Sequence, residues 1–289
     1  MSVRRGLVGA SPDSAGSLAD IGVRLALGAT AVAFGAPFLW IVAAAFDAEA
    51  GSYVPWPSAP TLANFVDLFR DFGFGQALRD SLVVAGGGAI LTTVTAALAG
   101  YALSRLVWRG ADGLAVGLLL LQTMPLAATM IPLYDLTRRL ALRNTYLGLI
   151  LVHAALALPL LIWLMKRFFD ALPIALEEAA WVDGASRLRA WREILLPLAR
   201  PGLALAVGLS FLVAWSEALL ALALTDPGSG KQTVALAFYR AAQRTGGYSS
   251  ERYEPIAAMG VLYVLPMLLL LLLVGRVAGG GLGGSLHGE

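Results

Sequence analysis

Six apolar segments, each long enough to cross a lipid bilayer as a helix, limit what this 289-residue chain can fold into. A helix needs about 20 apolar residues to span the hydrocarbon core. The predicted spans are Val23–Phe46, Ser81–Leu106, Leu114–Leu136, Tyr146–Phe169, Leu203–Leu224 and Ile256–Val274. Because lipid offers no partners to backbone N–H and C=O groups, helices of this length predict an all-α polytopic membrane protein.

The composition supports this class and excludes others. Hydrophobic residues make up 58% of the chain and charged residues 14%, and the mean hydropathy of +0.74 lies outside the range of soluble domains. The absence of cysteine excludes disulfides and cysteine-ligated metal sites. The two histidines, His153 and His287, are far apart and have no companion ligands, so we expect no metal site. The small net charge of +2, without interleaved basic and aromatic residues, argues against nucleic-acid binding.

The first apolar segment could be a membrane span or a signal peptide. Ala43–Ala45 resembles a cleavage site. The apolar run before it is longer than the roughly 7 to 15 residues of a signal-peptide core, so we expect it to remain as a span. In the second span, Gly86, Gly87, Gly88 and Gly100 favour close helix–helix contacts, because small side chains let backbones approach in lipid.

Six spans place both termini on one side of the membrane. Lys and Arg near the span ends favour a cytoplasmic N-terminus only weakly, because Arg138, Arg139 and Arg143 would then lie outside. The predicted organisation is a cytoplasmic tail at 1–22, a six-helix membrane domain at 23–275 with outer loops at 47–80 and 225–255, and a cytoplasmic tail at 276–289.

A polar segment, 173–201, separates the fourth and fifth spans. Pro173 can begin a helix, because the first turn needs no N–H from it, and Glu177 and Glu178 follow near the positive end of the helix dipole. Ala179 and Ala180 predict a flat face that packs closely against another surface.

The second half of this segment predicts a sharp turn and a second helix. Gly184 suits a left-handed position that ends the first helix, and Ser186 can cap a helix that runs through Trp191–Leu195 and stops at Pro197. A helix–turn–helix unit of this polarity does not cross lipid. It fits a rigid docking element for a soluble partner, or an amphipathic helix at the interface.

The spacing of the residues in this segment is specific. Glu178, Ala179 and Ala180 are followed by three residues and Gly184, then by nine residues and Ile194, one residue, Leu196 and Pro197. This pattern resembles, without a departure, the EAA loop of ABC importer permeases. The chain is therefore similar to binding-protein-dependent ABC importer permeases of the carbohydrate-uptake subfamily, and most like the maltose-type second permease subunit.

Stretches outside the loop resemble the same subfamily: Pro60–Phe69, Ala99–Gly110, Ile131–Leu136, Asn144–Leu151 and Ala214–Thr225. Three positions depart from its pattern. Asp80 and Ser216 each replace an expected Asn, and Asp47 replaces a frequent Lys. The C-terminal tail is also shortened. These departures leave the expected fold unchanged and leave the particular sugar open.

The resemblance implies a type I ABC importer permease fold of six transmembrane helices, with a cytoplasmic coupling helix between the fourth and the fifth. It implies an inner-membrane location in a prokaryotic cell, and three kinds of partner: a second permease subunit, a cytoplasmic ATPase dimer and an extracytoplasmic binding protein that delivers a di- or oligosaccharide-like sugar.

The resemblance also implies roles for residues of the loop, which seats in a cleft of the ATPase. We expect Glu178 to contact a cationic ATPase residue, Ala179 and Ala180 to permit the close fit, and Gly184 to make the turn. The ATPase-coupling set is Glu177, Glu178, Ala179, Ala180, Gly184, Ile194, Leu196 and Pro197. The alternative for Glu178 is compensation of the helix dipole alone.

The chain itself is not expected to be an enzyme. Gly228–Lys231 reads GSGK, like part of a phosphate-binding loop, but Thr225 stands where the first glycine belongs and Gln232 where a metal-binding Ser or Thr belongs. We therefore expect ATP and Mg²⁺ to be bound by partner subunits, and no cofactor to be bound by this chain.

Glu217 is an acidic residue inside an apolar span, and such residues are usually functional. It either lines a translocation path or holds the helix bundle together through an Arg or a backbone amide. Because the subfamily tends to hold an acid there, a structural or gating role is favoured. The neighbouring Trp215 is interpreted as a packing or interface anchor, with sugar stacking at the gate or pathway as the alternative.

Three other readings stay open. An ABC permease for another solute, such as a glycerol phosphate ester, an amino acid or phosphate, would have the same loop. An ion-coupled secondary transporter would use Glu217 near the midplane, but would have no role for an EAA loop. A membrane scaffold that transports nothing is the third.

Overall fold

The computed structural model describes residues 14–50, 57, 59–106, 110–245 and 254–282. In these ranges the regular elements are all helical, and one isolated bridge joins Asp47 and Pro60. The elements are α1 (Ser14–Ala45), α2 (Ala63–Asp71), α3 (Phe74–Arg105), α4 (Ala111–Leu120), the 3₁₀ turn η1 (Leu121–Thr123), α5 (Leu126–Arg139), α6 (Tyr146–Asp170), α7 (Ala175–Val182), α8 (Arg187–Ala190), the π-helical segment η2 (Trp191–Leu195), α9 (Leu196–Leu198), α10 (Arg200–Ser216), α11 (Leu219–Leu224), α12 (Val234–Thr245) and α13 (Glu254–Leu282).

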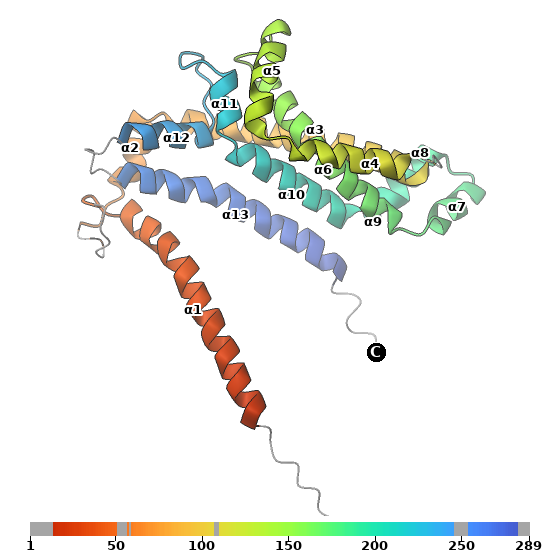
Figure 1. Ribbon diagram of the computed structural model, residues 1–289, viewed down its shortest axis with the longest axis horizontal. Helices are drawn as coiled ribbons and strands as arrows, with labels where there is room; N and C mark the ends of the chain where they lie inside the picture. Colours follow the sequence, from red (N-terminus) through yellow and green to blue (C-terminus); the bar gives the residue numbers. More distant parts are fainter. Residues whose placement is uncertain (1–13, 51–56, 58, 107–109, 246–253, 283–289) are drawn as a thin grey trace, which may run out of the picture.

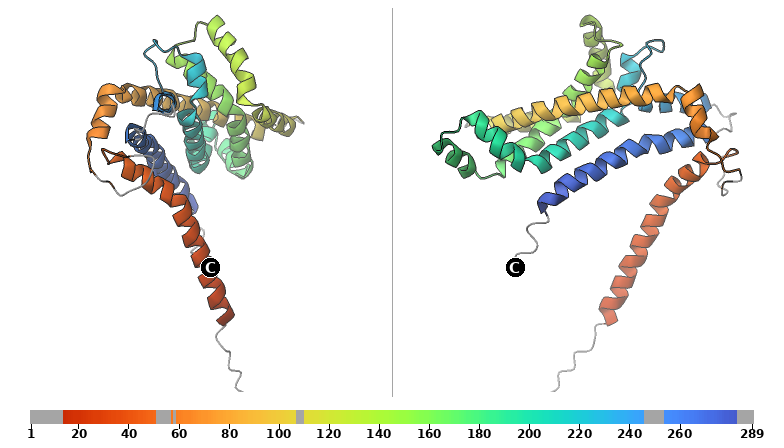
Figure 2. Two further views of the ribbon diagram at one scale, coloured as in Figure 1. Left: turned by 60° about the vertical axis from the view of Figure 1, so that its left-hand side comes forward. Right: turned by 180° about the vertical axis from the view of Figure 1, so that it is seen from behind.

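The long helices α3, α6, α10 and α13 run along the same axis and form the body of the molecule (Figure 1). α3 packs against α6 and α10, and α10 packs against α13. The C-terminal end of α1 contacts α13. Toward its N-terminus, α1 diverges from the body in every view (Figure 2). The large apolar side chains on the outside of the body, such as Leu272 at 64% exposure, are the surface expected of a chain that lipid surrounds.

Two glycines of α3 allow a close approach to α6. A Cβ placed on Gly100 would lie 2.7 Å from the backbone nitrogen of Lys166, and one on Gly87 would lie 2.7 Å from Ile150 Cδ1. The predicted close approach is therefore confirmed at these two positions. At Gly88 such a Cβ would be in ordinary contact with His153 Cβ at 3.9 Å, and at Gly86 it would meet no described residue of this chain within 4 Å.

Four helices are long and apolar enough to span a membrane, and two further pairs qualify if each bent pair is counted as one span. The third predicted span is one of these pairs: α4 with η1, and α5, meet at an angle of 97°. Pro125 explains the break, because proline disfavours helical backbone in the preceding residue, and Met124 is extended.

The fifth predicted span also differs from one straight helix. α10 begins at Arg200 and ends at Ser216, Glu217 is extended, and α11 begins at Leu219. The second span begins earlier than predicted, because α3 already starts at Phe74.

Candidate functional site

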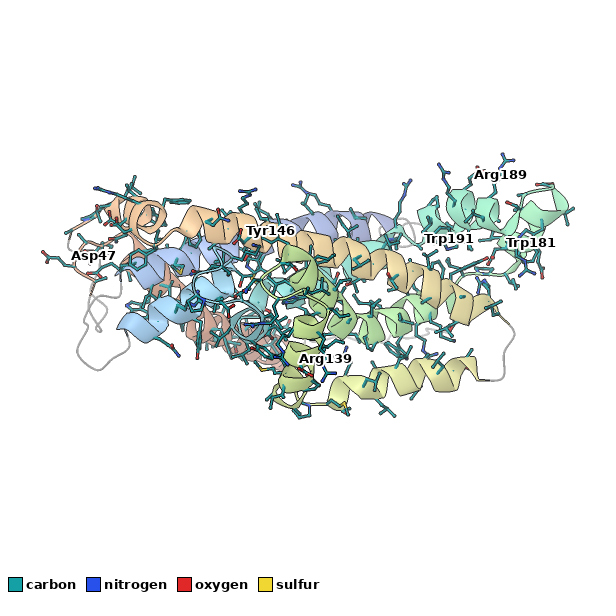
Figure 3. All side chains as sticks on the ribbon, turned by 90° about the horizontal axis from the view of Figure 1, so that it is seen from above. Asp47, Arg139, Tyr146, Trp181, Arg189 and Trp191 are labelled. Atoms are coloured by element: carbon teal, nitrogen blue, oxygen red, sulfur yellow. The ribbon has the colours of Figure 1, made fainter. Side chains whose placement is uncertain are left out.

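The predicted coupling loop lies at one end of the body, and the segments around α2 and α12 lie at the other (Figure 1). Figure 3 shows the same separation: Trp181, Arg189 and Trp191 lie at one end, and Asp47 lies at the opposite end. The structure therefore holds the coupling loop and the described parts of the two predicted outer loops at opposite ends of the long helices.

The first half of the loop folds into α7, and its end follows the prediction. Gly184 has a backbone φ of +85°. Gly184 N–H donates to Trp181 O at 3.0 Å, and Ala185 N–H donates to Ala180 O at 2.9 Å. This pair of bonds is a Schellman motif, which ends a helix and turns the chain sharply. Pro173 lies just before the first turn and not in it, since Ile174 is the N-cap.

One face of α7 is exposed at the end of the molecule. Glu178 and Ala179 lie on it, together with Val182, which is 88% exposed. Within the described part of the chain, the Glu178 carboxylate has no hydrogen-bond or ion-pair partner. Ala180 is buried, so only Ala179 of the predicted alanine pair contributes to the exposed face.

The other face of α7 carries Glu177, which is fully buried. One carboxylate oxygen accepts the Tyr101 hydroxyl at 2.8 Å, and the other is paired with Arg105 Nε. Arg105 also donates to Leu172 O at 3.0 Å. Glu177, a member of the predicted ATPase-coupling set, therefore does not lie on the exposed face, because its side chain points into the bundle. No local signal in the sequence connects it with Arg105.

The second half of the loop follows the prediction at its start and differs at its end. Ser186 Oγ accepts Arg189 N–H and caps α8. The helix does not stop at Pro197: it widens into η2, and Pro197 then lies in the first turn of α9. In a first turn the missing N–H of proline needs no partner. Ile194 and Leu196 are half-buried and Pro197 is exposed.

Glu217 lies in the break between α10 and α11. Its Oε1 accepts backbone N–H groups of Leu219 at 2.7 Å and Leu220 at 3.3 Å. These partners are backbone amides two and three residues further along the chain, and in the described residues no arginine pairs with Glu217. Trp215 is buried between α10 and α13, where its indole N–H donates to Tyr263 O at 3.1 Å and its ring stacks on Phe211.

A cavity of about 520 Å³ lies beside Glu217, at the bend between α4 and α5. His153 lines it, and its Nδ1 lies 2.7 Å from Leu149 O. Gln122 lines it too and donates to Leu156 O at 2.6 Å. The remaining wall is mainly apolar, so this cavity combines a few polar groups with an apolar surface. In the described residues no cluster of three or more acidic, histidine or cysteine side chains could hold a metal ion.

At the opposite end, two acidic residues hold loops in place. Asp80 is buried and accepts hydrogen bonds from Gln76, Tyr146 and the backbone of Gln232. Asp226 accepts the Asn144 side chain at 2.7 Å and pairs with Arg143 at 2.6 Å. The Asn144 hydrogen bond, helped by the charge of Arg143, lowers the pKa of Asp226 below its ordinary value.

The family model for binding-protein-dependent transport system inner membrane components matches residues 81–279. This match covers more than half of the chain and includes the whole coupling loop. The chain belongs to this family. As a binding-protein-dependent transport component, it is an ABC transporter permease of the inner membrane and not the enzyme that hydrolyses ATP, as the sequence predicts.

Relatives of this transport component are named as sugar permeases. The trehalose transport system permease protein of Mycobacterium tuberculosis is 34% identical over 247 residues, which cover 83% of this chain and 87% of that protein. The sulfoquinovosyl glycerol transport system permease protein of Agrobacterium fabrum is 34% identical over 171 residues. That match spans 58% of this chain and 60% of the relative.

A solved structure has the same fold as this transport component. It is the crystal structure of a bacterial ABC transporter involved in the import of the acidic polysaccharide alginate. One of its chains matches with a TM-score of 0.77 and 20% sequence identity, over 92% of this chain and 99% of that chain. This similarity supports the type I importer permease fold that the sequence predicts.

Proposed function

We propose that this chain is the permease subunit of an ATP-driven importer that carries a di- or oligosaccharide-like sugar across the inner membrane. A binding protein delivers the sugar at the α2–α12 end. A second permease subunit completes the path, and a cytoplasmic ATPase dimer, which binds ATP and Mg²⁺, docks at the α7 end. Both termini are then cytoplasmic, and 47–80 and 225–255 face outward.

One observation carries this proposal: the exposed face of α7, at the tip of the body, in a loop that follows the EAA pattern. Glu178 has no partner within the described part of the chain, while its neighbour Glu177 has two. A carboxylate that is exposed and unpaired is available for a charge-assisted hydrogen bond with an arginine or lysine. Beside it, the short side chain of Ala179 leaves room for a partner backbone.

The sugar specificity rests on the named relatives and on the chemistry of the cavity beside Glu217. Trehalose is the solute in the name of a relative whose match covers 83% of this chain and 87% of that protein. The apolar walls suit the carbon–hydrogen faces of a sugar, and the polar groups of His153, Gln122 and Glu217 suit its hydroxyls. Among the described residues, no lysine or arginine, which a phosphorylated solute would need, lines this cavity.

Glu178→Ala tests the coupling. The full importer, with its ATPase, second permease and binding protein, is reconstituted in proteoliposomes, and ATP hydrolysis and uptake of labelled trehalose and maltose are measured. We expect stimulation of ATP hydrolysis by the loaded binding protein to fall about tenfold, which corresponds to loss of one charge-assisted contact of about 1.4 kcal/mol.

Glu193→Ala is the matched control, because Glu193 is an exposed glutamate of the same loop that already pairs with Arg189 at 3.0 Å. It should leave stimulation near the wild-type value. Equal coupling in wild type and Glu178→Ala, at equal yield, would remove the proposed role of Glu178. Absence of ATP-dependent uptake of every sugar in a panel by the wild-type assembly would remove the proposed function itself.

A further inference from the structure

We infer that the buried Glu177–Arg105 pair attaches the coupling helix α7 to α3, so that α3, α6 and α7 move as one body. This inference rests on the proposed function, because it concerns how a displacement at α7 reaches the membrane helices. It makes Tyr101, Arg105 and Glu177 positioning residues: they contact neither the solute nor the ATPase.

The chain connects α7 to α6 through 171–174 and to α8 through 183–186, but it makes no direct connection to α3. α6 ends at Asp170 and α7 begins at Ala175, so four residues form the link. A link of this kind lets a helix pivot when it is pushed. A second kind of attachment, made by side chains directly to α3, restrains that motion.

The side chains supply this second attachment. Both carboxylate oxygens of Glu177 are engaged by residues of α3, one by Tyr101 and the other by Arg105. The side chains of Glu177 and Arg105 are 0% and 12% exposed. Charges so far from water are costly to separate, because neither would regain full hydration in the bundle. The pair therefore resists a pivoting motion of α7 more strongly than a surface ion pair would.

Arg105 extends the attachment to the link and to α6. Its guanidinium donates to Leu172 O at 3.0 Å, inside the link, and to Ser104 Oγ at 3.0 Å. Ser104 Oγ in turn donates to Asp170 at 2.6 Å, and Asp170 accepts from Lys166 at 2.8 Å. A continuous set of hydrogen bonds thus runs from α7 through α3 to the last turn of α6.

The helices that receive the displacement are themselves closely packed. At Gly100, one residue before Tyr101, the backbones of α3 and α6 nearly touch. The Tyr101 ring packs edge-on against Phe169 of α6, with 5.7 Å between ring centroids. A push on α7 at this end is therefore delivered to two long helices together, and not to α6 alone.

The test replaces both members of the pair by apolar residues of similar size, Glu177→Leu with Arg105→Met. Replacing a buried pair as a whole leaves no unpaired charge, so the chain is expected to fold and assemble. In proteoliposomes with the complete importer, we expect normal basal ATP hydrolysis and a ratio of sugar imported to ATP hydrolysed that falls at least fivefold. Asp135→Asn with Arg139→Gln, which removes an exposed ion pair of α5, is the control.

A distance measurement separates this role from mere stabilisation. The chain has no cysteine, so spin labels can be placed on Leu176→Cys in α7, away from the face of Glu178, and on Leu98→Cys in α3, both exposed positions. We expect the distance between the labels to be the same with and without ATP in the otherwise wild-type assembly. In the Glu177→Leu, Arg105→Met background it should change or broaden on ATP binding.

An unchanged import ratio and an unchanged label distance in the double variant would overturn the inference, while leaving the proposed function intact if the wild type still imports sugar with ATP. If the double variant does not accumulate, Glu177→Gln carries the same test. Glutamine keeps the size of the side chain but removes its charge, so a smaller loss of coupling is expected, and wild-type coupling with an unchanged label distance would overturn the inference.

Discussion

At Gly184 the backbone, and not the space around it, restricts the residue type. Its φ is +85°, and nothing lies within 4 Å of an added Cβ. We predict that Gly184→Leu strains the turn by about 1–2 kcal/mol, because an L-residue disfavours left-handed backbone, and lowers ATPase stimulation. Gly184→Asn should retain more of the ATPase stimulation than Gly184→Leu, since asparagine tolerates left-handed backbone better than leucine does. Equal stimulation in the Leu and Asn variants would show that the conformation of Gly184 does not govern coupling.

Glu217 offers a second prediction at the scale of a residue. Its Oε1 caps the start of α11, and a glutamine oxygen can accept the same two N–H groups. We therefore predict that Glu217→Gln keeps sugar uptake near the wild-type level. Glu217→Ala removes the cap of α11, so it should lower the stability of the folded protein by about 1 kcal/mol and reduce uptake. Uptake and thermal unfolding in detergent check this. Loss of uptake in Glu217→Gln at normal stability would favour a role for the charge in the translocation path.

At the scale of elements, the contact between α3 and α6 depends on glycine. In Gly100→Ala the new methyl group would meet the backbone of Lys166 at 2.7 Å, so the helices must separate. We predict a loss of about 1–3 kcal/mol, measured as a lower unfolding midpoint of the purified protein in detergent. Gly86→Ala in the same helix is the control, and its midpoint should stay or rise, because alanine favours a helix and finds open space there.

At the scale of the whole molecule, the proposed topology places the α7 end in the cytoplasm and the loop between α11 and α12 outside. Single cysteines in this cysteine-free chain can test it. We predict that a membrane-impermeant maleimide labels Ser229→Cys in intact cells, and labels Val182→Cys only after the membrane is opened. The reverse pattern would place the EAA loop outside and remove any role for it in meeting a cytoplasmic ATPase.

Features of this protein that depend on neighbouring residues can be predicted from the sequence, whereas features that depend on packing between distant segments cannot. The helical class, the left-handed turn at Gly184 and the cap at Ser186 are predictable, because each depends on a few neighbouring residues and on the absence of water in lipid. The EAA loop can be recognised for the same reason, because all residues of its pattern lie in one continuous segment of the chain. Pro125 indicates a break, but the 97° angle there depends on how α4 and α5 pack.

The sequence by itself determined that the chain crosses the membrane in helices and carries a helix–turn–helix loop of the EAA type. The EAA pattern already points to Glu178 as the glutamate that meets a partner, but only the tertiary structure decided that the adjacent Glu177 is buried. Glu177 and Glu178 lie about 100° apart around α7, so packing turns one into the bundle and leaves the other outside. Arg105 precedes Glu177 by 72 positions and meets it only because α3 and α6 bring the two ends of that segment together.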